Sequence, residues 1–352
     1  MSQPMSAEFS PTLTYLNTAA HGLFPARTTA VLHAAVREMA EAEMDQVGYY
    51  ERVEAARTAF AQLAGVPPTR VATGSAVAVH VGLIAQSLPE GTEVLVADGD
   101  FSSLVNPFAV RRPGLVLRSV PLPELADAVR PSTGLVAVSA VQSADGRVAD
   151  LAAVRAAAGA HGARVLVDTT QSTGWLTLDP ALADFTVCGA YKWLLCPRGT
   201  SFLTVPEDGG GLRPLHAGWI AGENPWETCY GPVEELARSA RRFDESPPFL
   251  PYLGAVPSLD LIAELGPEAI GKHNRGLAAR FRAGVRELGH RPVEADSAIV
   301  AVPGLGDAAE ALAKAGIRLS TRVGNLRAAF HLFNTEDDVD RALEVLGEHS
   351  RT

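Results

Sequence analysis

Short hydrophobic runs alternate with alanine-rich segments between residues 71 and 205. The runs are rich in β-branched residues and most end at Gly, Pro or Asp; they lie at 93–97, 115–120, 134–139, 164–168 and 184–188. Strands that are apolar on both faces and separated by helical segments are typical of a largely parallel sheet covered by helices on both sides. This pattern predicts an α/β core.

Two helices of this core have recognisable boundaries. The segment 151–160 follows Asp150, whose carboxylate can accept hydrogen bonds from free backbone N–H groups, and precedes His161-Gly162, where glycine suits the left-handed end of a helix. A further helix is expected over 77–88. The helix over 151–160 lies where a crossover between parallel strands requires a helix.

The pattern changes after residues 209–211, which are three glycines. A stretch with Pro and Trp leads to Ser-Pro-Pro-Phe-Leu-Pro at 246–251, which we interpret as an irregular connection. Beyond it we expect helices near 255–264 and 267–288, strands at 298–302 and 326–333, and a last helix from about 335. These elements predict a large domain over 15–245, a smaller α+β domain over 246–352, and an N-terminal extension over 1–14.

Composition and charge exclude several classes of protein. The chain has 352 residues, of which 47% are hydrophobic and 20% are charged. This is an average composition for a globular protein, so the chain should fold throughout. Its net charge of −10 repels phosphate backbones and anionic lipid, so neither nucleic acid nor a membrane is expected as a partner.

Targeting signals and cysteines point to the cytoplasm. The N-terminus has no basic segment followed by an apolar one, and no apolar run is long enough to span a bilayer. The three cysteines, Cys188, Cys196 and Cys229, are an odd number without CxxC spacing. We therefore expect free thiols in a reducing compartment and no zinc or other metal site.

Two charged residues follow predicted strands at positions that suggest catalysis. Asp168 ends the run 164–168, where open α/β sheets bind ligands, although alone it could simply cap the next turn. Lys192 follows the next strand and precedes Trp193-Leu194. Burying its ammonium is unfavourable unless the amine has a function in a site or the side chain extends to the surface. A lysine that forms a Schiff base with an aldehyde lessens that cost.

Together, Asp168 and Lys192 suggest pyridoxal 5'-phosphate. A carboxylate against the pyridine nitrogen keeps it protonated and lets the ring accept electrons, while the lysine binds the aldehyde and later moves a proton. The sequence therefore predicts a pyridoxal phosphate enzyme.

The motifs around these residues resemble the class V aminotransferase family of fold type I pyridoxal phosphate enzymes. They are Asp-Thr-Thr-Gln-Ser-Thr-Gly at 168–174 and Ala-Tyr-Lys-Trp-Leu-Leu-Cys-Pro-Arg-Gly at 190–199. The family includes cysteine desulfurases, isopenicillin N epimerase-like proteins and kynureninase, and the resemblance extends from residues 15–22 to 333–338. It implies the fold type I architecture, a homodimer with shared active sites and an amino-acid-like substrate. The motifs are specific for the cofactor and the fold, but they give little information about which substrate is bound.

The resemblance implies a role for each matching residue around the cofactor. Asp168 matches the partner of the pyridinium, Gln171 the residue bound to the phenolic oxygen, and Lys192 the Schiff-base lysine. The implied cofactor-binding set also includes Gly74, Ser75 and Ala76 of a phosphate loop, Tyr191, and Ser143 beside the ring. Phe101 matches the residue that stacks on the ring, where desulfurases carry His, unless it is a buried core side chain.

The resemblance also places residues on the substrate side. Arg327 matches an arginine that binds the substrate α-carboxylate through two parallel hydrogen bonds, a task for which Lys is a poor replacement. Arg322 either assists it or faces solvent. His21 lies in a segment that lines the substrate side in relatives, and otherwise is structural.

The chain departs from the family pattern at three places. Desulfurases carry a nucleophilic Cys just before the carboxylate-binding arginine, whereas 319–327 contains none, so a persulfide by that route is not expected. Cys196 stands where relatives usually have Gly. The relatives' cross-subunit phosphate contact is Gly-Thr, and the matching region here offers only Ser246.

These observations predict a pyridoxal phosphate-dependent enzyme acting on an amino acid or amine metabolite, of aminotransferase or C–S (β) lyase type. Alternatives on the same scaffold are an epimerase or racemase and a decarboxylative deaminase. A non-catalytic effector-binding module is an alternative of another class. The sequence does not fix which bond at the α-carbon breaks, and we expect amino-acid or secondary metabolism.

Overall fold

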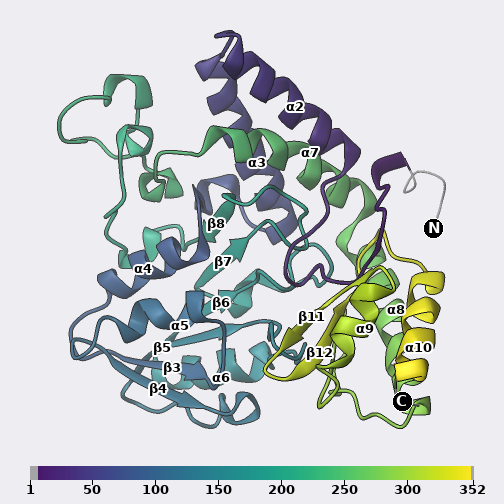
Figure 1. Cartoon of the computed structure of the whole chain (residues 1–352). Helices are drawn as coiled ribbons and strands as arrows, with labels where there is room; N and C mark the ends of the chain where they lie inside the picture. Colours follow the sequence, from purple (N-terminus) through teal and green to yellow (C-terminus); the bar gives the residue numbers. More distant parts are fainter. Residues whose placement is uncertain (1–6, 350–352) are drawn as a thin grey trace.

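The computed structural model describes residues 7–349, and a seven-stranded sheet forms its centre (Figure 1). The strand order is β2-β8-β7-β6-β5-β3-β4. The strands are β2 (Val71–Gly74), β3 (Glu93–Ala97), β4 (Val116–Val120), β5 (Thr133–Ser139), β6 (Arg164–Asp168), β7 (Phe185–Gly189) and β8 (Ser201–Thr204). Only β8 is antiparallel to its neighbours, β2 and β7, so the mostly parallel α/β sheet predicted from the sequence is confirmed.

The five strands predicted from hydrophobic runs lie within one residue of their expected bounds. Strands β3, β6 and β7 are almost entirely buried, as expected for a sheet covered on both faces. Strands β2 and β8 were not predicted individually, because each has only four residues and contains Thr, Ser or Gly rather than an apolar run.

Helices cover both faces of this sheet. They are α2 (Ala26–Ala40), α3 (Gln46–Ala64), α4 (Val77–Ser87), α5 (Ser102–Ala109) and α6 (Leu151–His161). The boundaries predicted for α6 are confirmed: the Asp150 carboxylate accepts a hydrogen bond from the Ala153 N–H (2.9 Å), and Gly162 adopts φ +70°. The sequence pattern did not predict α2 or α3.

Helix α7 (Phe249–Leu265) corrects one expectation. Residues 246–251 were predicted to be an irregular connection, but the helix begins at Phe249, and Pro251 lies in its first turn. A proline there removes no helical hydrogen bond, because the first N–H groups of a helix have no intrahelical partner. Figure 1 shows α7 beside α2 and α3, and Thr28 of α2 is hydrogen-bonded to Ser258 of α7 (2.7 Å).

The C-terminal part forms a second, smaller α+β unit. It comprises α8 (Pro267–Glu287), β9 (Ile299–Val302), α9 (Ala308–Lys314), β10 (Ile317–Arg318), β11 (Ser320–Arg322), β12 (Asn325–Ala329) and α10 (Glu336–His349). Strands β11, β12 and β9 form an antiparallel sheet, and β1 (Thr14–Tyr15) pairs with β10. The expected strand over 326–333 ends earlier, at Ala329. Beyond it, the Nε2 atom of His331 lies 2.9 Å from the Trp193 carbonyl oxygen. The domain boundary at residue 246 stays a prediction.

Three further features bear on the expected class of protein. No helix within residues 7–349 is long and apolar enough to cross a membrane. All three cysteines are free, with Cys188 and Cys196 buried and Cys229 exposed. The described part of the chain contains no cluster of three potential metal-ligating side chains.

Candidate active site

A pocket of about 370 Å³ lies at the carboxyl ends of the parallel strands. It contains many of the residues singled out in the sequence: Ser75, Ala76, Phe101, Ser143, Asp168, Gln171, Tyr191 and Lys192. Its other lining residues were not predicted: Val77, Ser103, Ser139, Thr170, Gly189, Arg198, Gly199 and Thr200. The fold thus brings together segments that are more than 100 residues apart in the sequence.

Lys192 lies on a closed loop between β7 and β8. Backbone hydrogen bonds from Ala190 to Thr200 (3.1 Å) and from Cys196 to Ala190 (3.1 Å) fix the two ends of this loop. The lysine side chain is only 4% exposed, and burial lowers its pKa to about 8, although the charge of Asp168 opposes this shift. A substantial fraction of the amine is therefore unprotonated and nucleophilic at mildly alkaline pH.

Asp168 is the last residue of β6 and is buried in the same pocket. Its carboxylate accepts a hydrogen bond from the Thr170 N–H (2.8 Å). Burial raises its pKa to about 6, and the hydrogen bonds from Thr170 and the charge of Lys192 reduce this rise. Because a carboxylate has about four acceptor sites, Asp168 retains capacity for a cationic N–H donor inside the pocket.

Gln171 links several parts of the site. Its amide nitrogen donates to the Ala19 carbonyl (3.0 Å) and to the Ser143 hydroxyl (3.2 Å), while its amide oxygen accepts from the indole N–H of Trp193 (2.7 Å). These contacts fix the orientation of the amide. They also connect the segment before α2 with the lysine loop.

The N-terminus of α4 provides backbone donors at one end of the pocket. Ala76, which precedes the helix, provides no side-chain cap, and the Val79 N–H donates to its carbonyl (3.1 Å). Among the described residues the N–H groups of Val77 and Ala78 have no partner, so they can bind an anion. Gly74 directly precedes Ser75 of the pocket wall. A Cβ atom on Gly74 would lie 2.6 Å from the His80 ring, so a larger residue does not fit at this position. This combination of small residues and free amides fits a phosphate group.

Phe101 lies at the pocket wall, 41% exposed, which excludes a core position. The preceding residue, Asp100, fixes this wall: its carboxylate accepts hydrogen bonds from the N–H of Phe101 (2.6 Å) and from Ser139 and Gln142. The role of Asp100 was missed in the sequence, although an acidic residue after a buried strand was a usable signal.

Arg327 lies just behind the pocket rather than in its wall. The guanidinium donates to the carbonyl and hydroxyl of Ser143, which lines the pocket, and to the Ser320 hydroxyl (3.1 Å). Burial lowers its pKa to about 9. Its Nη2 is buried without a hydrogen-bond partner in the described part of the chain, so a donor remains available.

The other predicted substrate and cross-subunit residues lie outside the pocket lining. Arg322 is exposed and donates to its neighbour Thr321 (2.8 Å), so the structure favours the solvent-facing alternative. His21 is half-buried, with its ring 5.9 Å from that of Tyr191, and burial lowers its pKa. Ser246 is exposed.

Arg198 is the most prominent residue that sequence reasoning missed. Its guanidinium carbon lies 4.1 Å from the centre of the Tyr191 ring, and the side chain lines the pocket. The signal was present, because Arg198 stands within the conspicuous motif that follows Lys192.

Residues 15–342 match the sequence model of the family described as "Aminotransferase class-V". The chain belongs to the class V aminotransferase family. It is 30% identical to isopenicillin N epimerase from Amycolatopsis lactamdurans, with 84% of each chain covered, and 29% identical to kynureninase from Deinococcus radiodurans, with 69% of this chain and 60% of the relative covered. The predicted family is confirmed.

Solved structures show the same fold. A cystine C–S lyase in complex with cysteine persulfide has a TM-score of 0.85 at 23% identity, covering 96% of this chain and 98% of the other. A cysteine desulfurase from Thermococcus onnurineus has a TM-score of 0.84 at 19% identity, covering 96% and 95%. These matches confirm the fold type I architecture, and the family match shows a pyridoxal phosphate-dependent enzyme of the class V aminotransferase family.

Proposed function

We propose that Lys192 and Asp168 are the catalytic residues of this enzyme and that its substrate is an amino acid or a related amine metabolite. The observation that carries this proposal is the burial of both groups in one pocket, with the lysine pKa lowered to about 8 and the aspartate pKa raised to about 6. Perturbed titratable groups that share a pocket are typical of active sites. Folded proteins rarely bury a lysine without a use for it.

Each residue has a distinct task. When bound, pyridoxal phosphate supplies an aldehyde for an amine and a ring that accepts electrons from the substrate α-carbon. Lys192 Nζ can release and regain a proton near neutral pH, so it is the group positioned to move a proton at that carbon. Asp168 would hold the ring nitrogen through its negative charge, and the amides at the start of α4 would hold the phosphate.

Other residues of the pocket orient the cofactor and the substrate. We assign Phe101 to the face of the cofactor ring, and Gln171, Ser143 and Tyr191 to its edge. Arg327 supports substrate binding through the unpaired Nη2 and through its bonds to Ser143. A guanidinium that is already buried loses less solvation when it binds a carboxylate than one in water would.

The cysteines provide no support for a thiol nucleophile. Burial raises the pKa of Cys188 to about 12 and raises that of Cys196 well above its usual value, so both remain protonated thiols. Cys229 is exposed and does not line the pocket. We therefore favour amino-group transfer or C–S cleavage that needs no cysteine.

Epimerisation is the second candidate. It is supported by the similarity to isopenicillin N epimerases from Amycolatopsis lactamdurans and Streptomyces clavuligerus, each 30% identical. Epimerisation and amino-group transfer both begin with removal of the α-proton, and they differ in where a proton returns. Chiral analysis of an amino acid incubated with the enzyme distinguishes the two.

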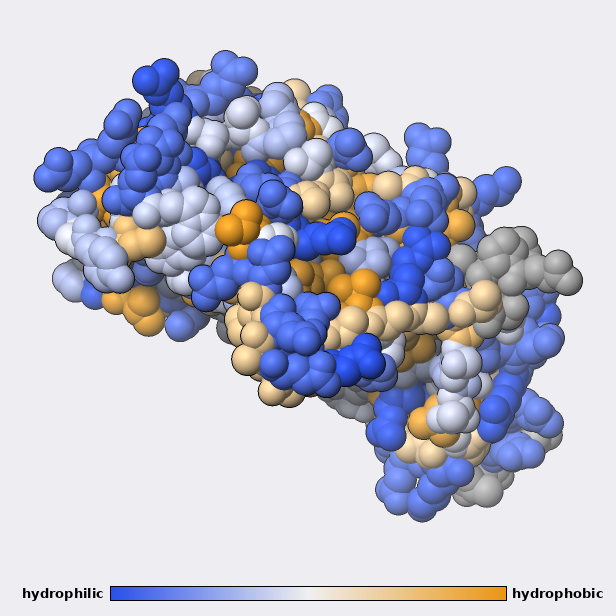
Figure 2. Space-filling view, turned by 90° about the horizontal axis from the view of Figure 1, so that it is seen from above, coloured by the Kyte–Doolittle hydropathy of each residue, from blue (hydrophilic) through white to orange (hydrophobic). Residues whose placement is uncertain are grey.

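We further propose that the enzyme is a cytoplasmic homodimer of amino-acid or secondary metabolism. Figure 2 shows hydrophobic side chains gathered in patches between hydrophilic ones on the face seen from above. Leu215, Trp226 and Tyr230 are exposed on the segment 206–245, which extends away from the sheet in Figure 1. Exposed large apolar side chains favour association, and light scattering of the purified protein measures its mass.

Borohydride reduction tests the proposed function directly. Treating the protein with pyridoxal phosphate and then borohydride should attach a phosphopyridoxyl group to the peptide that contains Lys192, which mass spectrometry detects. A label on Lys272 or Lys314, or no label, would refute the assignment. A Lys192→Ala variant should keep its circular dichroism spectrum and lose turnover.

A further inference from the structure

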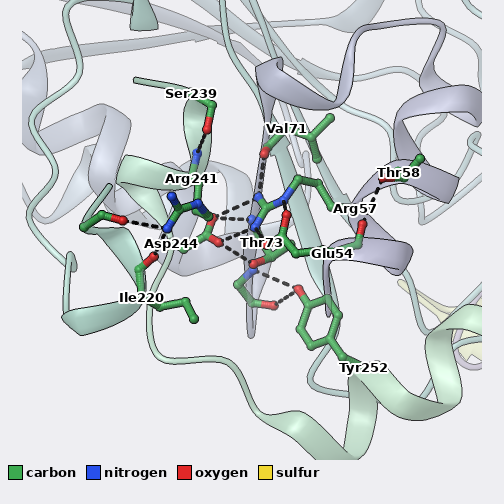
Figure 3. A network of polar contacts seen from close by, with 12 residues as sticks. Glu54, Arg57, Thr58, Val71, Thr73, Ile220, Ser239, Arg241, Asp244 and Tyr252 are labelled. Carbon is green, nitrogen blue, oxygen red and sulfur yellow. Dashed lines mark hydrogen bonds and ion pairs between the residues drawn. The ribbon is translucent and has the colours of Figure 1, made fainter. Parts of the chain in front are cut away.

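Three consecutive backbone N–H groups at the end of β2 are bound by side chains from one distant segment, 244–252. The N–H of Thr73 donates to the Asp244 carboxylate (2.8 Å), that of Gly74 to the Tyr252 hydroxyl (2.9 Å), and that of Ser75 to the Glu245 carboxylate. Figure 3 shows Thr73, Asp244 and Tyr252 within a larger polar network. The third contact lies at the pocket, because Ser75 lines it.

The charge of Asp244 is neutralised inside the protein. Its carboxylate contacts the Arg57 guanidinium at 2.6 Å and accepts a hydrogen bond from the Thr73 hydroxyl at 2.9 Å (Figure 3). Arg57 also donates to the Val71 carbonyl and to Glu54. This buried network fixes the residues just before Glu245 against the strand that leads into the phosphate loop.

The charge of Glu245 has no such compensation. No ion pair of Glu245 exists within residues 7–349. The neighbouring Arg241 and Arg242 donate instead to backbone carbonyls, among them those of Ile220 and Ser239. The ring of His80 lies next to it over Gly74, but burial lowers the pKa of His80 to about 4, so that ring is neutral at physiological pH.

An uncompensated carboxylate is therefore held where the proposed phosphate site begins. The N–H groups at this helix start favour an anion, which explains why Glu245 binds there. The same preference brings Glu245 into conflict with the cofactor. A phosphate that uses the Ser75 N–H must displace the carboxylate or remain beside a like charge.

From this arrangement we propose that Glu245 is an internal competitor of the cofactor phosphate. Its carboxylate accepts from the Ser75 N–H, and it must give up this contact when the phosphate of pyridoxal phosphate uses the same N–H. Glu245 thereby weakens cofactor binding specifically through the phosphate group. The proposal rests on the proposed function, because it takes the start of α4 as the phosphate site.

Cofactor titrations test this competition. Enzyme freed of cofactor with hydroxylamine is titrated with pyridoxal phosphate and with pyridoxal, and the dissociation constants are measured by quenching of tryptophan fluorescence. Glu245→Gln keeps an oxygen that can accept from Ser75 and removes only the charge. It should bind pyridoxal phosphate roughly tenfold or more tightly than wild type, since one like charge is removed beside the phosphate, and should bind pyridoxal with unchanged affinity.

The matched control is Glu235→Gln, which removes the same charge from an exposed position on the segment 206–245 and should change neither constant. Inorganic phosphate provides a second measurement: it should raise the melting temperature of cofactor-free Glu245→Gln more than that of wild type. Equal or weaker binding of pyridoxal phosphate by Glu245→Gln, or an equal gain for pyridoxal, would overturn the proposal. Failure of wild type to bind pyridoxal phosphate at all would instead refute the proposed function, and the competition with it.

Discussion

The amine nitrogen of Lys192 lies 5.0 Å from the centre of the Phe101 ring. The two residues come from the ends of different strands, β7 and β3, and meet only across the pocket. The amine forms no hydrogen bond within the described residues and faces an aromatic surface. A buried amine without a fixed partner is available to react with an aldehyde.

The first prediction concerns the pH dependence of that reaction. Because burial lowers the pKa of Lys192 to about 8, the rate at which cofactor-free enzyme captures pyridoxal phosphate should rise up to about pH 8 and then level off. Stopped-flow absorbance measures this rate. A rate that still increases between pH 9 and 10.5 would show that the amine titrates like an exposed lysine.

The second prediction concerns Asp168 and stability. The folded pKa of about 6 lies above the ordinary value of 3.8, so the folded cofactor-free protein binds the proton more tightly and loses stability as the pH rises from about 4 to 6. Asp168→Asn should remove this loss. At pH 7.5 the cofactor-free variant should be more stable to urea by up to about 3 kcal/mol, and at pH 4 about equally stable.

The same Asp168→Asn variant should nevertheless be a poor enzyme. Without the negative charge the ring nitrogen is no longer held protonated, so turnover should fall by orders of magnitude while the phosphate contacts still hold the cofactor. Near wild-type turnover, or a less stable cofactor-free variant at pH 7.5, would contradict the role assigned to this carboxylate.

The third prediction separates two neighbouring arginines. Arg327→Ala should lower kcat/KM for a carboxylate substrate by roughly 2 to 5 kcal/mol in activation free energy, because it removes a buried charged donor behind Ser143. Arg322→Ala, from the same antiparallel sheet, is the control and should have little effect, since Arg322 is exposed. Equal losses in both variants would refute the assignment.

The fourth prediction concerns the cysteines. Replacing Cys188, Cys196 and Cys229 together by Ser should leave turnover largely intact, since two are protonated and buried and the third is outside the pocket. Mass spectrometry of wild type incubated with free cysteine should show no protein persulfide. A persulfide, or an inactive triple variant that still binds cofactor, would show that a thiol takes part.

The fifth prediction concerns the network in Figure 3. Asp244→Asn leaves Arg57 buried without a full counter-charge, so the free energy of unfolding should fall by roughly 3 to 5 kcal/mol. Asp340→Asn breaks an exposed ion pair with Arg280 and should cost less than about 1 kcal/mol. Urea denaturation measures both, and similar losses would contradict the structural role of the buried pair.

Local sequence was sufficient for most of the central sheet. The apolar runs that became β3, β5 and β6 are buried on both faces, so their hydrophobic pattern is continuous and needs no tertiary information to be read. The ends of α6 follow from Asp150 and Gly162 in the same way. Helix α7 was misjudged at its start because three prolines between residues 247 and 251 resemble a break, although Pro251 is compatible with a first turn.

The sequence by itself determined the family and singled out Asp168 and Lys192 as candidate catalytic residues, because each follows a buried strand and the surrounding motifs resemble one family. The tertiary structure decided what these residues contact. Three contacts depend on residues that are 39 to 184 positions apart in the chain. They are the bond from Arg327 to Ser143, the bond from Ser139 to Asp100 beside Phe101, and the bond from the Ser75 N–H to Glu245. Such contacts arise from the packing of whole elements, so no local pattern of residues records them.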